Sequence, residues 1–531
     1  MRACYVIAIT ILIACAGRAI GSQEDYVLKP GKPKGIATGK KTILFVDDHD
    51  ILYRSGTERT LNRPKRLEAN PIIKQDKPWE YLIAYAAVYR DPDSGKYQLW
   101  YQAYSGERAQ EKTKRCVVCY AESDDGIHFT KPNLGLFAFN GIKDTNIVLI
   151  ANGGMSDRYG NAVVVDPRDR DASRRYKMGF TDFVVNNGRE RPGLCVAFSP
   201  DGIHWTKYPK APVQGTTYGD YECPVPYTDE VPVKYSPTPM GMADAVDVFY
   251  DPVRKVYVNY AKMWIDGPAG GMHWKHAMGR TESKDFINWS DPELVLAPDD
   301  QDPPYTEFHT TPVFYYNNRY FCLNQILNRS IGGGVIDVEL MVSRDGYDWD
   351  RPFRNDWFIP RGQPGQFDSG SLFTNATPIV LPDEIRFYYG GYSGGAIGDD
   401  AVTSSGLGLA SIPLDRFAGL RPVAKSESLT LAKPIEHIGQ VTLKPLDLSL
   451  YKTITLNADA SDGSIQVELL SARGRRIHRF AQEDSIPIKG DSLAHAVKWN
   501  GASLSDLPPG QYMIRLHLNN ATVYALSLSP K

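Results

Sequence analysis

The sequence predicts an all-β protein in which a five-bladed β-propeller is followed by a C-terminal β-sandwich. Three observations lead to this fold class. A short phrase recurs along the chain, runs of aromatic and β-branched residues precede each copy, and turn residues separate those runs. Repetition at long intervals marks a repeat architecture, and these intervals suit a four-stranded blade with long loops better than a helical solenoid.

The repeated phrase has the form Ser-x-Asp-Gly-x-x-Trp in its clearest copies. Its copies are Ser123–Phe129, Ser199–Trp205, Ser283–Trp289, Ser343–Trp349 and, in degraded form, Ser411–Phe417. The Ser and Asp side chains of such a phrase can hydrogen-bond the backbone of their own turn. The terminal aromatic ring is expected to pack between blades. The phrase is therefore predicted to support the fold and to take no part in chemistry.

Each copy of the phrase closes a unit of four strands. The first strand ends in a tight turn, which an Asp followed by Pro marks at Asp91, Asp166 and Asp251. A second strand follows, a third runs into the phrase, and a fourth begins at the aromatic residue. Five such units predict a propeller over residues 42–422, in which Thr42–Val46 is expected to add an outer strand to the last blade.

The pattern changes near Val423. Short alternating strands such as Ser464–Leu470 and Gln511–His517 are separated by turn signals, among them Pro508-Pro509-Gly510. Strands of this kind at short intervals are typical of an antiparallel sandwich. A separate β-sandwich is therefore predicted over residues 423–531.

The N-terminal residues predict export from the cytoplasm. An apolar run from Tyr5 to Ala14 follows Met1-Arg2 and is too short to span a bilayer, which indicates a signal peptide over residues 1–22 and a linker over 23–41. The segment ending at Cys15 also matches a bacterial lipoprotein signal, in which Cys15 would carry the lipid. A soluble exported form and a lipid-anchored form both stay open, and no other segment is apolar enough to span a membrane.

The composition limits the kinds of molecule that the protein can be expected to bind. The net charge of −2 argues against nucleic acid or an anionic membrane as partner, because both need a basic surface. The cysteines are too few and too scattered for a disulfide framework. Cys116 and Cys119 form a single CxxC, but on a strand their side chains point to opposite faces. No metal site and no cofactor are predicted.

Candidate functional residues lie just before the innermost strands. A propeller gathers the starts of these strands around one axial mouth, where one side chain from each blade can converge. Every unit has at least one acid at this place, and the polar residues there are Glu80, Asp157, Asn161, Asp244, Asp247, Glu307, His309 and Asp368. Packing explains such a cluster poorly, because neighbouring carboxylates repel and raise one another's pKa values.

Clustered carboxylates suit the hydrolysis of a glycosidic bond. One must be protonated to donate to the leaving oxygen, and another must be ionised to activate water or to attack the sugar carbon. Glu307 is predicted to be the general acid and Asp244 the base or nucleophile. Asp368 and Glu80 would orient substrate hydroxyls or tune pKa values. Glu80 could instead cap a turn, and Asp368 could simply belong to one.

The remaining candidates are expected to bind substrate, since flat aromatic faces and polar side chains both contact sugar rings. They are Asp157, Asn161, Asp247, His309, Lys262, Trp264 and Trp79. His273 and His276 lie in the loop beyond Trp264. They lack further clustered ligands, so no metal is expected there.

With the repeats and the mouth acids together, the chain resembles the five-bladed propeller glycoside hydrolases, the group of arabinanases, β-xylosidases and invertase-like enzymes. The resemblance rests on the five phrase-closed units and on the propeller-then-sandwich order, which is most like the invertase branch. It implies an axial site with a nucleophile or base, a supporting Asp and a Glu acid. This chain departs from that pattern at Glu80, where an Asp is expected, and its best Glu lies on the fourth blade.

The sequence therefore predicts an exported glycoside hydrolase acting on a plant or algal polysaccharide or its oligomers. Two alternatives stay open: a carbohydrate-binding propeller without catalysis, and a propeller glycan lyase or phosphorylase. A lectin would repeat the same polar pocket between blades. Here the mouth acids differ from blade to blade, which favours one catalytic centre.

Overall fold

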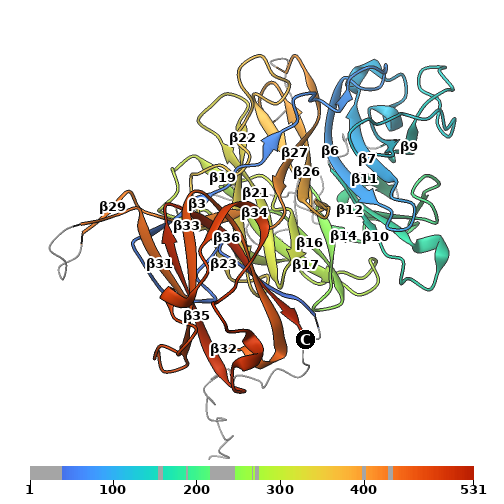
Figure 1. Ribbon diagram of the computed structural model, residues 1–531. Helices are drawn as coiled ribbons and strands as arrows, with labels where there is room; N and C mark the ends of the chain where they lie inside the picture. Colours follow the sequence, from blue (N-terminus) through green and yellow to red (C-terminus); the bar gives the residue numbers. More distant parts are fainter. Residues whose placement is uncertain are drawn as a thin grey trace, which may run out of the picture. The chain divides into compact units, whose positions relative to one another are not determined.

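The computed structural model describes residues 39–531 except 154–159, 187–188, 216–244, 266, 269–273, 397–401 and 428–433. This part of the chain consists of strands, short 3₁₀ turns and loops without an α-helix, so the expected all-β class is confirmed (Figure 1). The 3₁₀ turns are Gly106–Arg108, Lys112–Lys114, Ala172–Arg174, Leu448–Leu450, Gln482–Asp484 and Leu504–Asp506. Over the same residues, no helix has the length and apolar character of a membrane span. The predicted signal peptide lies outside the described residues, as does nearly all of the predicted linker.

The first three repeat units each form an antiparallel sheet of their own. The first unit contains β6 (Leu82–Arg90), β7 (Tyr97–Tyr104), β8 (Cys116–Ser123) and β9 (Ile147–Ile150). The second contains β10 (Asn161–Val165), β11 (Tyr176–Asn186), β12 (Arg189–Ser199), β13 (Thr206–Lys207) and β14 (Gln214–Gly215). The third contains β15 (Val248–Asp251), β16 (Val256–Ile265), β17 (Lys275–Ser283) and β18 (Glu293–Leu296). In each unit consecutive strands are neighbours, as the sequence predicts, except that β13 and β14 both pair with β12.

The fourth and fifth units share one sheet, because a single parallel pair joins Ile336 to Ser371. The fourth unit contains β19 (Thr306–Phe308), β20 (Val313–Tyr316), β21 (Arg319–Asn328), β22 (Val335–Ser343) and β23 (Trp349–Asp350). The fifth contains β24 (Ser371–Phe373), β25 (Ile379–Val380), β26 (Glu384–Tyr392) and β27 (Ser405–Pro413). Its outer strands come from the start of the chain, since β4 (Lys65–Arg66) and β5 (Ile73–Lys74) both pair with β27.

Hydrogen bonds between units follow a closed cycle. In most junctions a side chain near the second strand of one unit donates to the backbone oxygen of the phrase Asp in the next unit. These donor–acceptor pairs are Gln98–Asp201 at 3.2 Å, Arg174–Asp285 at 2.8 Å, Arg254–Asp345 at 2.5 Å and Arg386–Asp125 at 2.7 Å. Between the fourth and fifth units, Tyr316 and Asn317 donate to the carboxylate of Asp415 instead. The fifth unit thus returns to the first.

Within each copy, the phrase makes the bonds that the sequence predicts. In the second copy, Ser199 Oγ accepts from the Gly202 N–H at 2.9 Å, and Asp201 accepts from the N–H groups of Ile203 and His204. The copies at Ser123, Ser283 and Ser343 repeat this pattern. Terminal aromatics also pack across units, as Trp205 does against Trp100 with ring centres 6.4 Å apart. The phrase is a structural element.

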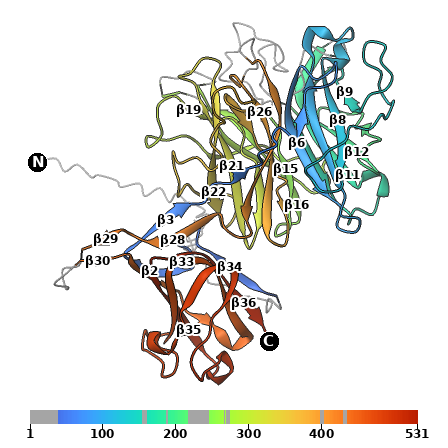
Figure 2. The same ribbon diagram turned by 45° about the horizontal axis from the view of Figure 1, so that its top comes forward.

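The C-terminal part forms a ten-stranded sheet around its own apolar core. Its strands are β1 (Lys41–Leu44), β2 (Ile51–Ser55), β3 (Thr57–Leu61), β28 (Ala418–Pro422), β31 (Ile438–Leu443), β32 (Leu446–Asp447), β33 (Tyr451–Ser471), β34 (Ile488–Ala496), β35 (Gln511–Asn519) and β36 (Thr522–Pro530). A separate short pair joins β29 (Lys425–Ser426) to β30 (Ile435–Glu436). Figure 2 shows β2 and β3 beside the C-terminal strands.

The expected place of Thr42–Val46 is wrong. This segment does not extend the last repeat unit, because β1 pairs with β36 from Lys41 opposite Leu528 to Leu44 opposite Ala525. Ile43 and Phe45 contribute to the core of the C-terminal sheet. The sequence of an isolated apolar strand does not indicate which strand it will pair with. The outer strands of the fifth unit are β4 and β5 instead.

Candidate active site

The starts of the five innermost strands meet in one place, the central mouth, defined here by Tyr85, Asn161, Asp247, His309 and Phe373. The ring of Tyr85, in the first unit, lies 4.9 Å from that of Phe373 in the fifth and 6.5 Å from that of His309 in the fourth. Since the first and fourth units are not neighbours in the cycle, the contact with His309 spans the centre.

Two further contacts bring the second and third units to the central mouth. A Cβ placed on Gly160 would lie 3.2 Å from the Val246 nitrogen, so the chain just before Asn161 runs directly against the chain just before Asp247. The Ala376 N–H of the fifth unit donates to Asp247 Oδ1 at 3.0 Å. The third and fifth units are not neighbours either, so this bond also spans the centre.

A bulge in β6 supplies the first unit's contribution. The pairing of β6 with β7 shifts between Ala84 and Ala86, and Tyr85 between them adopts a φ of 43°. A bulge with positive φ redirects one side chain and is costly for an aromatic residue. Sequence reasoning did not select Tyr85, because a bulge is not visible in an apolar run.

Asp247 is a buried carboxyl with few donors. Its residue is 6% exposed, and among the described residues only the Ala376 N–H donates to the carboxyl group, at Oδ1. Burial raises the pKa of Asp247 well above its usual range, and the one backbone hydrogen bond offsets this only in part. Burial thus favours the protonated form of Asp247.

Glu307 is a buried carboxylate with strong donors. On Oε2 it contacts His276 Nδ1 at 2.5 Å, and Arg329 Nε donates to Oε1 at 3.1 Å. Burial alone would raise its pKa, but the hydrogen bond and charge of His276, together with the charge of Arg329, outweigh burial and lower the pKa of Glu307 to about 2. The expected role of Glu307 as proton donor does not fit this environment, because the group is ionised.

The partners of Glu307 come from neighbouring strands. His276 lies on β17 and stacks against Trp264 of β16, its register partner, with ring centres 3.7 Å apart. Trp264 is half-buried and Lys262 is buried, two residues earlier on the same strand. Trp264 thus lies beside the carboxylate–histidine pair, and its expected role in substrate binding stays a prediction. Arg329 follows β21 and was not among the predicted residues.

His309 and Asn161 add polar groups at the central mouth. His309 Nδ1 contacts Gln325 Oε1 at 2.9 Å, which fixes the orientation of the imidazole. Both side-chain amide atoms of Asn161 are buried and have no hydrogen-bond partner among the described residues, and the same holds for the hydroxyl groups of Thr310 and Thr311. Buried polar atoms without protein partners indicate that water or a ligand satisfies them.

Glu80 is built into the first unit. Its carboxylate accepts from Tyr101 Oη at 2.6 Å, from Lys131 Nζ at 2.7 Å and from the N–H groups of Asp76 and Lys77. This is the turn cap that the sequence left open as an alternative. Trp79 beside it is 1% exposed and packs on Phe139, so it presents no face to a sugar.

Asp368 is built into the fifth unit in a similar way. Its Oδ2 accepts from Tyr389 Oη at 2.9 Å and from Arg66 Nε at 3.1 Å. Tyr101 and Tyr389 are equivalent, since the residues before them, Trp100 and Tyr388, each donate to a phrase glycine carbonyl in the next unit of the cycle. Glu80 and Asp368 are thus a matched pair of carboxylates, each held by a tyrosine and a cation.

Two predicted residues, Asp244 and Asp157, lie outside the described residues. Within the part of the chain that the structure describes, no group of three or more His, Cys, Asp or Glu side chains is arranged to hold a metal ion. The candidate site therefore consists of Asp247, Glu307 and the side chains around them.

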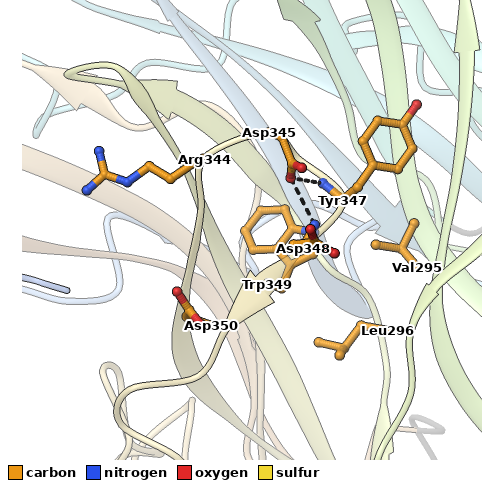
Figure 3. Close-up of a pocket in the computed structure, with 8 residues that line it drawn as sticks. All are labelled: Val295, Leu296, Arg344, Asp345, Tyr347, Asp348, Trp349 and Asp350. Atoms are coloured by element: carbon orange, nitrogen blue, oxygen red, sulfur yellow. Dashed lines mark hydrogen bonds between the residues drawn. The ribbon is translucent and has the colours of Figure 1, made fainter. Parts of the chain in front are cut away.

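A depression of about 410 Å³ lies away from the central mouth, against the fourth copy of the phrase (Figure 3). Its lining includes Asp345, Trp349 and, from the third unit, Val295 and Leu296. The carboxylate of Asp345 already accepts the N–H groups of its own turn. This depression follows from the phrase, and its other acids, Asp348 and Asp350, are exposed to solvent, so it is not the candidate site.

No family model and no curated protein matches this chain. Solved structures show a distant likeness. A glycosyl hydrolase from Bacteroides ovatus has 16% identity over 66% of this chain and 94% of its own, with a TM-score of 0.41. An N-acetylgalactosamine deacetylase from F. plautii has 15% identity over 68% and 96%, with a TM-score of 0.39.

A fructofuranosidase from Schwanniomyces occidentalis, complexed with fructosylnystose, extends over more of the chain. It has 10% identity over 89% of this chain and 99% of its own, with a TM-score of 0.39. Such structural neighbours are propeller glycoside hydrolases and related enzymes at low identity. Likenesses at these TM-scores assign neither an activity nor a substrate, and this chain stands as a distant structural neighbour of carbohydrate-active enzymes.

Proposed function

We propose that the protein is a carbohydrate-active hydrolase with its active site at the central mouth of a five-bladed β-propeller. Five phrase-closed units in a closed hydrogen-bond cycle support the propeller, and the separate apolar core of the C-terminal sheet, to which Ile43, Phe45 and Ile51 also contribute, supports an accessory sandwich. The reaction proposed is cleavage of a glycosidic bond in an oligosaccharide or polysaccharide.

One observation carries the proposal: two buried carboxyl groups, Asp247 and Glu307, have pKa values displaced in opposite directions. Burial with one donor favours the protonated form of Asp247, and a histidine and an arginine favour the ionised form of Glu307. Glycosidic cleavage needs one acid of each kind. Of the other two candidates, Glu80 accepts from four protein donors, and Asp368 accepts from Tyr389 and Arg66 on Oδ2.

The roles follow from the protonation states. Asp247 donates its proton to the leaving glycosidic oxygen, which breaks the C–O bond, and water supplies the hydroxyl group at the sugar carbon and the proton that restores Asp247. Glu307 stabilises the positive charge that develops on the sugar ring, or attacks its carbon. A carboxylate with a pKa of about 2 is a weak base, so activating water suits it less well.

The test uses purified protein, a panel of neutral and acidic plant and algal glycans, and detection of reducing sugar. Cleavage by the wild type, with at least a hundredfold loss in both Asp247→Asn and Glu307→Gln, is expected, because general acid–base groups contribute about 10²–10⁴-fold. Asp348→Asn, at an exposed carboxylate of the phrase, is the matched control. Retained cleavage in both site variants would refute the assignment.

The same panel separates the alternatives. A product absorbing in the ultraviolet indicates a lyase, phosphate-dependent cleavage indicates a phosphorylase, and binding without any product indicates a lectin. The unlike residues of the central mouth favour a single catalytic centre over a lectin.

We also propose export, on the apolar run between Tyr5 and Ala14. Expression of the full chain in a bacterium, followed by fractionation and N-terminal sequencing, tests this. Cleavage before Cys15 with lipid attached would identify the anchored form, cleavage near Gly21 the soluble form, and an intact cytoplasmic chain would exclude both.

A further inference from the structure

A basic hairpin stands out on the C-terminal sheet. It comprises Arg473, Arg475, Arg476, His478 and Arg479, all of them exposed, in a chain whose net charge is −2. Nothing in the proposed active site uses this segment. These five residues form the basic hairpin.

The hairpin has a defined turn. The Gly474 N–H donates to the Ser471 carbonyl at 2.8 Å, the Ser471 N–H donates to the Arg475 carbonyl at 2.8 Å, and the Arg475 N–H reaches Ser471 Oγ at 3.1 Å. Gly474 has a φ of +78°, which a glycine adopts without strain. The guanidinium groups are thus presented from an ordered turn, which reduces the entropy lost on binding.

The local carboxylates leave most of the positive charge uncompensated. Arg476 is paired with Glu468 and Glu483, while Asp484 accepts the Ala481 N–H. Among the described residues, no ion pair joins Arg473, Arg475 or Arg479 to a carboxylate. Three arginines are therefore available to a ligand.

The sheet face beside the hairpin extends the basic surface. A row of register partners crosses four neighbouring strands, from Tyr53 on β2 through Thr442 and Arg515 to Glu468 on β33. Arg515 contacts the Tyr53 hydroxyl, and its guanidinium carbon lies 5.8 Å from the ring centre.

The centre of this row is already neutralised. Glu468 is buried under Arg476, Arg515 and His517. Tyr53 is 43% exposed, so its ring is accessible. The face therefore combines an accessible aromatic ring with a cationic rim.

We propose that the basic hairpin and the Tyr53–Arg515 face bind an anionic glycan, one whose sugar rings carry carboxylate or sulfate groups. Guanidinium groups match both anions in bidentate geometry, and a tyrosine face suits a sugar ring. The choice of a glycan over another polyanion rests on the proposed function. The overall negative charge of the chain argues against nucleic acid, which needs an extended basic surface.

The test is retardation of the full-length protein in native gels that contain polygalacturonate, dextran sulfate or neutral dextran. Retardation by one or both anionic polymers and none by dextran is expected, and the retardation should weaken with salt because exposed charges are screened. Polygalacturonate alone identifies carboxylate recognition, and dextran sulfate alone identifies sulfate recognition. Retardation by neither polymer overturns the proposal.

The site is located by a matched pair of triple variants. Arg473→Gln, Arg475→Gln and Arg479→Gln together should weaken binding about tenfold, since each exposed ionic contact contributes modestly. The control replaces exposed lysines elsewhere, Lys96→Gln, Lys143→Gln and Lys284→Gln, with the same change in net charge. Equal losses in the two variants, or tighter binding of single-stranded DNA than of either polymer, would overturn the proposal.

The outcome is independent of catalysis. The hairpin variant should cleave a short soluble oligosaccharide at the wild-type rate, because the substitutions leave the central mouth unchanged. If no glycan is cleaved at all while retardation persists, the proposed hydrolase activity fails and the anionic-glycan face stands.

Discussion

Two pairs of carboxyl groups occupy comparable places in the repeat and have different environments. Glu80 and Asp368 each precede an innermost strand, and a tyrosine and a cation hold each of them within its own unit. Asp247 and Glu307 also lie at strand starts, but Asp247 has one backbone donor, from the fifth unit, and Glu307 accepts from His276 of the third unit as well as from Arg329 of its own. Only the second pair has pKa values displaced in opposite directions by different causes.

The difference shows that position in a repeat does not decide the role of a carboxylate. The hydrogen bonds of Glu80 and Asp368 join parts of one unit, so these carboxylates serve the fold. A carboxyl group that is buried with few donors, or ionised by a histidine and an arginine, has a displaced pKa that contributes nothing to holding its own unit together and suits it for acid–base chemistry. The donors around the oxygen atoms separate the two kinds.

The largest expected effect is on catalysis. Asp247→Asn should lower turnover about 10²–10⁴-fold, because the amide cannot protonate the leaving oxygen. Glu80→Gln should leave turnover per folded molecule within about twofold, since Glu80 serves the first unit. Initial rates normalised to folded protein measure both, and equal losses in the two variants would erase the distinction between the pairs.

The second effect is on stability. Asp368→Asn should lower the free energy of unfolding by about 2–4 kcal/mol, because Arg66 and the Tyr389 hydroxyl lose a buried charged acceptor. Urea denaturation measures this, with exposed Asp348→Asn as the control. A loss of activity at full stability would instead move Asp368 into the active site.

The third effect is on pH dependence. His276→Gln removes the charge that holds the pKa of Glu307 at about 2, so that pKa should rise. Because Glu307 acts in its ionised form, activity should then fall at a higher pH on the acidic side. Measurement of kcat/KM between about pH 4 and about pH 7 checks this, because ordinary Glu and His side chains titrate within that range.

The kcat/KM of the wild type should stay constant over the acidic half of that range, and the kcat/KM of the variant should fall as the pH decreases. His204→Gln, at an exposed histidine of the phrase, should behave as wild type. Stability follows the same sign: the lowered pKa of Glu307 stabilises the fold above the ordinary Glu pKa, and this contribution is lost as pH falls through about 2. The variant should therefore gain less stability as the pH rises from acid to neutral.

The smallest effect concerns the phrase. Ser199→Ala removes the acceptor for the Gly202 N–H and should cost about 1–2 kcal/mol of unfolding free energy, because that group is buried. Turnover should not change. Thermal unfolding and initial rates together test it, and a loss of turnover without a loss of stability would give the phrase a role outside the fold.

The repeat made the four-strand units and the phrase bonds predictable. Ser and Asp were expected to hold their own turn, and they do so in four copies. The partner of Thr42–Val46 was not predictable, because an isolated strand contains no information on which edge it joins. Asp244 and Asp157 lie outside the described residues, so their selection stays a prediction.

Part of the candidate site could be predicted from the sequence. The phrase serine pairs with the tyrosine that opens the second strand, as Ser283 does with Tyr257. Counting pairs outward from these two residues brings His276 opposite Trp264. Arg329 lies two residues beyond Leu327, the register partner of Glu307 within the fourth unit. His276 could not be inferred in this way, because it comes from β17 of the third unit and strand order within a unit says nothing of contacts across units.

The two ends of the chain are interlocked twice, and this bears on how the protein is made. β4 and β5 complete the fifth unit through β27, while β1 completes the C-terminal sheet through β36. During synthesis the first of these strands leaves the ribosome long before its partner is translated. The early units can form as they emerge, but the cycle of units stays open until the fifth unit is translated, and the C-terminal sheet stays incomplete until β36 arrives. Loss of a few residues at the C-terminus would therefore leave the N-terminal strand without a partner.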